Sequence, residues 1–309
     1  MATLALSVSR TVSCGSTAGL RCCLLRHGIA SSRLSAPFAV REVQRRSLST
    51  DLVTVETDPD NKDVAILKMN HKPVNGLNIQ LMTEMTAALE KLENSARGVI
   101  LTSNVSNIFS AGLDITGFFQ KTPEETDAFW CALQDMWLKL YGSPLVTIAA
   151  INGHSPAGGC MLAMSCDYRI MARAKYSIGL NETLLGIVAP FWFVDVMKRT
   201  IGHRESEKAL QLGTLYTCEQ ALQIGLVDEL CDPDQVLDQA KAEMKKWLKI
   251  PDASKKSDKV LLTARPHQQA DFMQETRHQL LHHVHSAIFS TESSRNVPPK
   301  SEEKIKIAP

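Results

Sequence analysis

Short apolar runs alternate with longer segments of helical apolar spacing over residues 53–250. Runs rich in Val, Ile and Leu predict strands. The predicted strands are 53–58, 64–70, 98–103, 144–151, 167–172 and 176–180. Segments with an apolar residue every three or four positions predict helices. The predicted helices are 79–96, 123–141, 193–201, 204–212, 217–224 and 233–248, with a shorter one through Leu162 and Met164. This alternation indicates an α/β fold.

Turn-forming residues mark several of these boundaries. Residues 59–61 (Pro-Asp-Asn) predict a tight turn between the first two strands. Gly202, Gly213 and Gly225 stand where three of the helices are expected to end. The segment 291–309 is polar and contains two adjacent prolines, which predicts a frayed tail.

Composition excludes several classes of function. The chain has 309 residues and a formal net charge of +1, so no general attraction to nucleic acid or to an anionic membrane is expected. No stretch reaches the roughly 18 consecutive apolar residues of a spanning helix, so no integral membrane segment is predicted. The eight cysteines form no C-x-x-C pair, which favours reduced thiols.

The first fifty residues differ from the rest of the chain. They contain seven arginines, nine serines and one acid, Glu42. An Arg- and Ser-rich segment with few acids is typical of an organelle transit peptide, and a disordered basic tail is the alternative. We predict a mitochondrial transit peptide over 1–50, cleaved near 45–49, and a mature protein in the mitochondrial matrix.

Two glycine-bearing segments carry the candidate chemistry. Residues 107–115 read NIFSAGLDI and residues 151–167 read INGHSPAGGCMLAMSCD, and each follows an apolar strand. Glycines let backbone approach a ligand closely, and a helix that starts there leaves free N–H groups. Two such loops side by side predict a site for a negatively charged carbonyl oxygen.

A serine hydrolase is the first alternative, because GHSPA at 153–157 nearly matches the G-x-S-x-G elbow. In that elbow the residue after the serine donates its backbone N–H to the oxyanion. Here that residue is Pro156, which has no N–H, and the last glycine is missing. Ser155 is therefore disfavoured as a nucleophile.

The motifs FSAGLDI and INGxxPAGGCxLAxxCDYRI resemble the two signature segments of the crotonase (enoyl-CoA hydratase/isomerase) superfamily. The similarity continues through 174–192 and 209–230, and NETLLGIVAPFW points to the isomerase branch. The resemblance implies a crotonase fold, with a spiral core of repeated β-β-α units over 51–250. It also implies a homotrimer and a C-terminal helical region over 251–309, of which 265–309 departs from the isomerase pattern.

The resemblance also implies the site residues. The two backbone donors of the oxyanion hole fall on Leu113 and Gly158. The expected acyl-CoA thioester contacts are Ala111, Gly112, Leu113, Asp114, Ile115 and Gly158. The substrate itself carries the coenzyme A, and neither a further cofactor nor a metal is expected.

One carboxylate distinguishes the expected reaction. Hydratases of the superfamily use two glutamates, at the positions held here by Met161 and Glu182. A thioether transfers no proton. Hydration needs a water activated between two groups, whereas moving a double bond needs one base that takes a proton from C2 and returns it to C4. Glu182 as the single catalytic residue therefore favours conversion of 3-enoyl-CoA to trans-2-enoyl-CoA in β-oxidation of unsaturated fatty acids. Its apolar neighbours are expected to raise its pKa if it is buried.

Other assignments stay open at this point. An enoyl-CoA hydratase and a non-catalytic crotonase-like protein that binds RNA are the alternative functions. Phe191, Trp192 and Phe193 fit either an acyl tunnel or the core. Lys72 fits either a CoA phosphate contact or an ordinary surface position. His278, His282 and His285 share a helix face, for which a solvated surface is favoured over a metal site.

Overall fold

The computed structural model of the chain describes residues 52–115, 122–254, 257 and 259. The predicted transit peptide lies outside these residues. So do most of the C-terminal region, including the three histidines, and the segment that follows Ile115.

Six strands of the described chain form the larger sheet, in the order β1-β2-β3-β5-β7-β10. They are β1 (Val53–Asp58), β2 (Asn61–Met69), β3 (Gly98–Ser103), β5 (Val146–Ile151), β7 (Tyr168–Ala172) and β10 (Glu229–Cys231). Only β1 and β2 pair antiparallel, and the other neighbours are parallel. All residues of β3 and β5 are buried, which explains why their sequences are mostly apolar.

A second sheet of four strands has the order β4-β6-β8-β9. Its strands are β4 (Asn107–Ile108), β6 (Gly153–Pro156), β8 (Ser177–Gly179) and β9 (Tyr216–Thr217). The first three run parallel to one another, and β9 pairs antiparallel with β8.

Helices follow pairs of strands in a repeating order. Three successive units read β1-β2-α1, β3-β4-α2 and β5-β6-α3. The α-helices are α1 (Ile79–Leu92), α2 (Pro123–Tyr141), α3 (Gly158–Met164), α4 (Phe191–Ile201), α5 (His203–Leu212), α6 (Cys218–Gln223) and α7 (Val236–Trp247). From the second unit on, the first strand joins the larger sheet and the second strand joins the smaller one. The predicted β-β-α core is confirmed.

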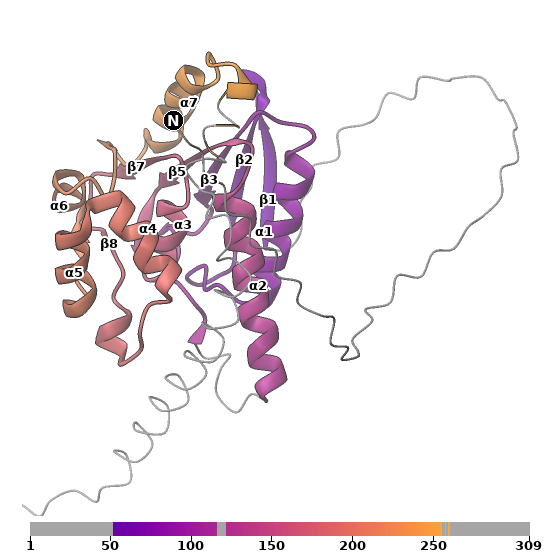
Figure 1. Cartoon of the computed structure of the whole chain (residues 1–309). Coiled ribbons are helices and arrows are strands. Elements are labelled where there is room, and N and C mark those ends of the chain that lie inside the picture. The colour runs from indigo at the N-terminus through magenta and orange to yellow at the C-terminus, as the bar shows by residue number, and fades with distance from the viewer. Residues whose placement is uncertain (1–51, 116–121, 255–256, 258, 260–309) are drawn as a thin grey trace, which may run out of the picture. The chain divides into compact units, whose positions relative to one another are not determined.

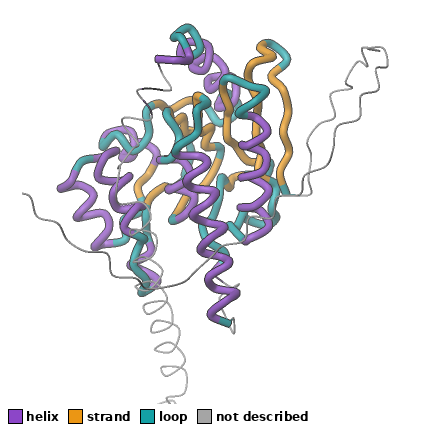
Figure 2. The backbone as a smooth tube through the Cα atoms, turned by 45° about the vertical axis from the view of Figure 1, so that its right-hand side comes forward, coloured by secondary structure: helices purple, strands orange, loops and turns teal. Residues whose placement is uncertain are grey.

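The larger sheet is covered on both faces (Figures 1 and 2). Val99 and Leu101 of β3 belong to the main core, together with buried residues of α1, α2, α3 and α4. Ile100 between them points to the opposite face and packs in a smaller core with Ala240 and Met244 of α7. The period-two alternation of β3 thus serves two apolar layers.

Helix α1 is shorter than its apolar pattern predicts. It ends at Leu92 instead of continuing to residue 96. The side chains of Asn94 and Ser95 donate hydrogen bonds to the carbonyls of Glu90 and Lys91 in the last turn of the helix. These side-chain donors satisfy carbonyls that the ending helix leaves without a helical N–H partner. The predicted ends at Gly202, Gly213 and Gly225 are confirmed, and all three glycines have positive φ. No helix in the described ranges is long and apolar enough to cross a membrane.

Candidate active site

Three neighbouring parallel strands of the smaller sheet lead into the candidate site. Leu113 follows the carboxyl end of β4, Gly158 follows β6, and Glu182 follows β8. Because β6 pairs with both β4 and β8, the same edge of this sheet carries all three connections. The topology therefore brings together the three residues on which the sequence places the chemistry.

The backbone around Leu113 leaves its N–H group free. Leu77 N donates to Gly112 O at 2.8 Å, and Asp114 N donates to Leu77 O at 3.1 Å. These two bonds make a parallel bridge between Leu77 and Leu113, in which the N–H of Leu113 points away from Leu77. Within the described chain this N–H donates no hydrogen bond.

The second donor lies beside the first. Gly158 is the first residue of α3, so its N–H has no partner within that helix. A Cβ placed on Gly158 would lie 3.3 Å from Leu113 N, and one placed on Gly112 would lie 2.8 Å from Gly158 N. The two loops therefore touch, and any side chain at 158 would press against the other donor. This arrangement fits an oxyanion hole.

Glu182 begins the short 3-10 helix η2 (Glu182–Leu185) and is only 6% exposed. Its Oε2 has no hydrogen-bond partner in the described chain. Burial raises the pKa of Glu182 to about 7. The strand before it is tied to the second loop, because Ala157 N donates to Gly179 O at 2.8 Å. A carboxyl group with this pKa both accepts and releases a proton near neutral pH.

Met161 is fully buried in the main core. Ser165 Oγ donates to Met161 O at 2.7 Å and lies 3.5 Å from its Sδ. The neighbouring Cys160 is also fully buried, and burial followed by the charge of Glu182 raises the pKa of its thiol. Neither side chain offers a second proton-transfer group near neutral pH.

A cavity of about 390 Å³ opens beside the first loop. It is lined by His71, Lys72, Pro73, Val74, Gly76, Ala111, Gly112, Leu113, Asp114 and Ile115. All five residues expected at 111–115 therefore share one cavity wall. The sequence singled out Lys72 but gave no sign that residues 71–74 and 76 line the same cavity.

The remaining sequence candidates lie elsewhere. Ser155 is fully buried on β6, and its hydroxyl has no partner in the described residues, so no base activates it. Trp192 and Phe193 are 1% and 0% exposed and belong to the main core, with Phe191 packed against it. The described part of the chain holds no group of three metal-ligating side chains.

The sequence pattern described as enoyl-CoA hydratase/isomerase matches residues 60–306. The chain belongs to the enoyl-CoA hydratase/isomerase family. Within this family, the mitochondrial enoyl-CoA delta isomerase 1 of Mus musculus is 50% identical over 242 residues, which cover 77% of this chain and 82% of the mouse protein. The Homo sapiens protein of the same name is 47% identical over 220 residues, covering 70% of this chain and 72% of the human one.

Solved structures of the family have the same fold. The human mitochondrial delta3-delta2-enoyl-CoA isomerase matches with a TM-score of 0.72 and 42% identity, covering 79% of this chain and 98% of that structure. An enoyl-CoA hydratase from Bacillus halodurans matches with a TM-score of 0.67 but only 24% identity, and this likeness concerns the fold alone. The crotonase resemblance read from the glycine motifs is thereby confirmed.

Proposed function

We propose that this chain is an isomerase that converts 3-enoyl-CoA to trans-2-enoyl-CoA. The observation that carries the proposal is the buried carboxyl group of Glu182, with a pKa of about 7, on the sheet edge that also carries two backbone N–H donors without a partner among the described residues. The names of the mouse and human relatives support the same reaction.

In the proposed mechanism, Glu182 takes a proton from C2 of the bound 3-enoyl thioester. The electron pair of that C–H bond forms the C1–C2 double bond of the enolate, and the negative charge moves to the thioester oxygen. The N–H groups of Leu113 and Gly158 donate hydrogen bonds to this oxygen. Removing one such donor typically lowers the rate 10²- to 10³-fold, so two fixed donors lower the barrier by several kcal/mol.

Collapse of the enolate then completes the shift of the double bond. The carbonyl re-forms and the C2–C3 double bond appears, while the electron pair of the former C3–C4 double bond takes the proton back from Glu182 to form a C4–H bond. The carboxylate is regenerated, and no electron leaves or enters the substrate. The reaction is therefore redox-neutral, and no step of it calls for a metal or a cofactor beyond the substrate's own coenzyme A.

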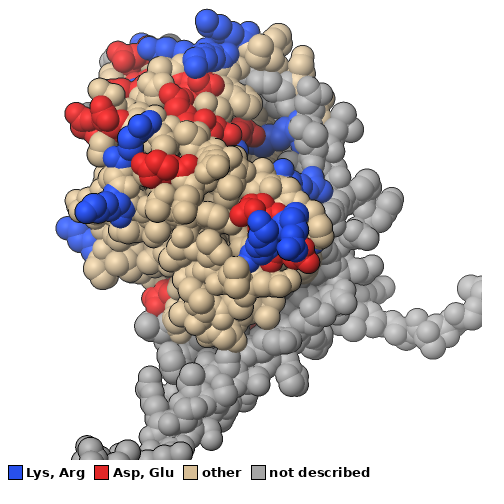
Figure 3. All heavy atoms as spheres, turned by 90° about the vertical axis from the view of Figure 1, so that its left-hand side faces the viewer, with Lys and Arg blue, Asp and Glu red and all other residues tan. Residues whose placement is uncertain are grey.

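Two alternatives have less support. A hydratase needs a second acid or base, and the position after the second glycine loop holds the buried thioether of Met161. An RNA-binding role calls for a basic surface. On the face that lies at the left of Figure 1, acidic and basic side chains are interspersed (Figure 3).

The cellular setting is part of the proposal. The relatives are named mitochondrial, which supports that location. We assign the mature protein to the matrix on the Arg- and Ser-rich composition of residues 1–50, which we propose as a cleaved transit peptide. A homotrimer is proposed on the crotonase resemblance.

A turnover assay tests the proposal. Purified protein is supplied with 3-enoyl-CoAs of several chain lengths, and formation of the conjugated 2-enoyl thioester is followed by its absorbance. We expect turnover in the wild type and its loss in Glu182→Gln, with binding of the CoA ester retained. Absence of turnover with every chain length in folded wild-type protein would overturn the assignment.

A further inference from the structure

Asn75 is a fully buried polar residue that none of the proposed chemical steps uses. It has a left-handed backbone with φ of 49°, a conformation that Asn tolerates better than most residues. Its Nδ2 donates to Ser103 Oγ at 2.7 Å and to Phe109 O at 3.0 Å, and its Oδ1 accepts from His71 N at 2.8 Å. Through these bonds the side chain of Asn75 links the end of β3 and the start of the first glycine loop to His71, which lines the cavity.

Ser110 carries this connection to the donor residue. Its hydroxyl donates to Asn75 O at 2.8 Å and accepts from Gly112 N at 3.2 Å. The side chain is fully buried, so water does not replace either bond. The backbone of Gly112, the residue before Leu113, is therefore held from Asn75 through one buried hydroxyl group.

Backbone bonds complete the attachment. Ala111 N donates to Val74 O at 2.9 Å, and Leu77 N donates to Gly112 O at 2.8 Å. Both the N–H and the carbonyl oxygen of Gly112 are therefore hydrogen-bonded, and its φ is 89°. Because the carbonyl of Gly112 faces Leu77, the N–H of Leu113 points away from Leu77, and Leu113 N lies beside Gly158.

We propose that Asn75 and Ser110, hereafter the clamp, are positioning residues for the Leu113 N–H donor. The inference rests on the proposed isomerase function and adds to it the residues that set the donor's direction. Neither side chain is expected to touch the substrate, so both act through the backbone of Gly112.

The clamp matters chemically because a donor stabilises an oxyanion only if it is aimed before the charge forms. A displacement near 1 Å lowers rates by up to about 10²-fold. The thioester oxygen carries little charge in the ground state and more in the transition state. Loosening the clamp therefore lowers kcat more than it raises KM.

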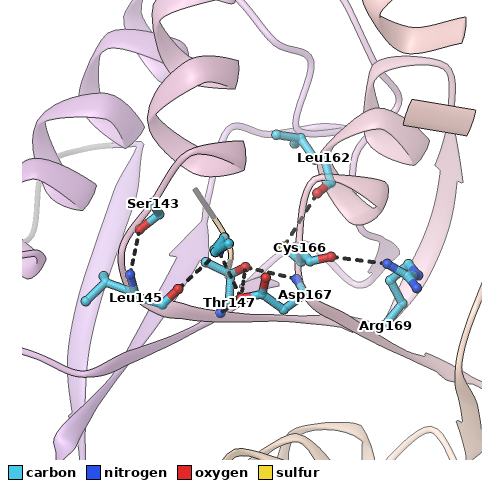
Figure 4. A network of polar contacts seen from close by, with 8 residues as sticks. Ser143, Leu145, Thr147, Leu162, Cys166, Asp167 and Arg169 are labelled. Atoms are coloured by element: carbon cyan, nitrogen blue, oxygen red, sulfur yellow. Dashed lines mark hydrogen bonds and ion pairs between the residues drawn. The ribbon is translucent and has the colours of Figure 1, made fainter. Parts of the chain in front are cut away.

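Two variants and two matched controls test the clamp. Ser110→Ala removes one hydroxyl, and Asn75→Gly removes the amide while permitting the positive φ. Ser143→Ala is the control for a buried serine, since Ser143 is 1% exposed and its Oγ accepts from Leu145 N in a separate network (Figure 4). Ser206→Ala is a second control for a buried serine, since Ser206 is 0% exposed and its Oγ donates to Gly202 O at the start of α5, away from the clamp.

For Ser110→Ala and for Asn75→Gly we expect kcat to fall roughly 10- to 100-fold with KM changed less than about threefold. Because both residues act on one peptide, the double variant should lose little more than the worse single one. The controls should keep wild-type kcat. Thermal unfolding checks that each variant is folded, and Ser110→Ala decides the result if Asn75→Gly is not.

A folded Ser110→Ala protein with wild-type kcat, or one in which KM alone rises, overturns the clamp. If Glu182→Gln is inactive in the same assay, that result leaves the proposed isomerase intact. If the wild type itself turns over no 3-enoyl-CoA, the proposed function fails, and the clamp fails with it.

Discussion

Replacing Glu182 by Gln separates the chemistry of this residue from its effect on stability. The two side chains have nearly the same shape, but Gln neither takes up nor releases a proton near neutral pH. Loss of a positioned general base typically lowers the rate 10²- to 10⁴-fold, so kcat should fall by at least about 10²-fold. In the wild type, kcat/KM should fall about tenfold per pH unit below pH 7, where burial keeps Glu182 protonated.

The same substitution should stabilise the protein at alkaline pH. The folded pKa of about 7 lies above the ordinary glutamate value of 4.5, so folding favours the neutral carboxyl. The contribution of Glu182 to stability is then greatest below pH 4.5 and is lost as the pH rises to 7, because the unfolded chain releases its proton first. The difference between the two pKa values corresponds to about 3 kcal/mol. The Glu182→Gln variant does not lose this stability, because Gln does not titrate in this pH range.

Urea unfolding of both proteins at pH 4.5 and pH 8 measures the effect. The stability of Glu182→Gln relative to the wild type should rise by about 3 kcal/mol between these two pH values. Comparing the change with pH, instead of one absolute value, cancels any difference in packing between the two side chains. If the difference in stability between the two proteins does not change with pH, Glu182 does not have the raised pKa of a buried carboxyl group. If the variant keeps a near-normal kcat, Glu182 is not the catalytic base.

Three further outcomes are expected. Gly158→Ala places a methyl group 3.3 Å from Leu113 N. In a folded protein this should lower kcat/KM by roughly 10²-fold. Unchanged kinetics would contradict the assignment of Gly158 and Leu113 to an oxyanion hole. The wild type should leave the absorbance of a 2-enoyl-CoA unchanged, whereas a steady decay would identify a hydratase. Asp167 accepts hydrogen bonds from Thr147 N, Thr147 Oγ1 and Lys259 Nζ. Asp167→Ala should therefore lower the free energy of unfolding by about 3 kcal/mol in a urea titration. A loss below about 1 kcal/mol would contradict this expectation.

The strands and helices that form the two cores were predictable because their apolar periodicity reflects burial. Strands β3 and β5 are buried on both faces, so their sequences are mostly apolar. The predicted start of a helix at residue 123 is confirmed, and the structure adds a reciprocal capping box of Thr122 and Glu125 that the sequence analysis did not name.

The smaller sheet was not predictable in the same way. Strands β4 and β9 have two residues each and β6 has four, too few for any periodicity to emerge. Their pairing depends on contacts between segments distant in the sequence, as between Asn107 and Gly153. The sequence therefore showed two glycine loops but not the sheet that joins them, and it gave no signal for Asn75 as a buried link between loops.

The repeat of the fold explains why the site forms at this edge. From the second unit on, each unit directs its second strand into the smaller sheet, so the connection that follows that strand recurs at the same edge. The second and third units present backbone N–H groups there, at Leu113 and Gly158. The connection after β8 presents the carboxyl of Glu182. Since β4, β6 and β8 are parallel neighbours, one geometric repeat brings two donors and one base together, and the chemistry depends on which residue stands at each equivalent position.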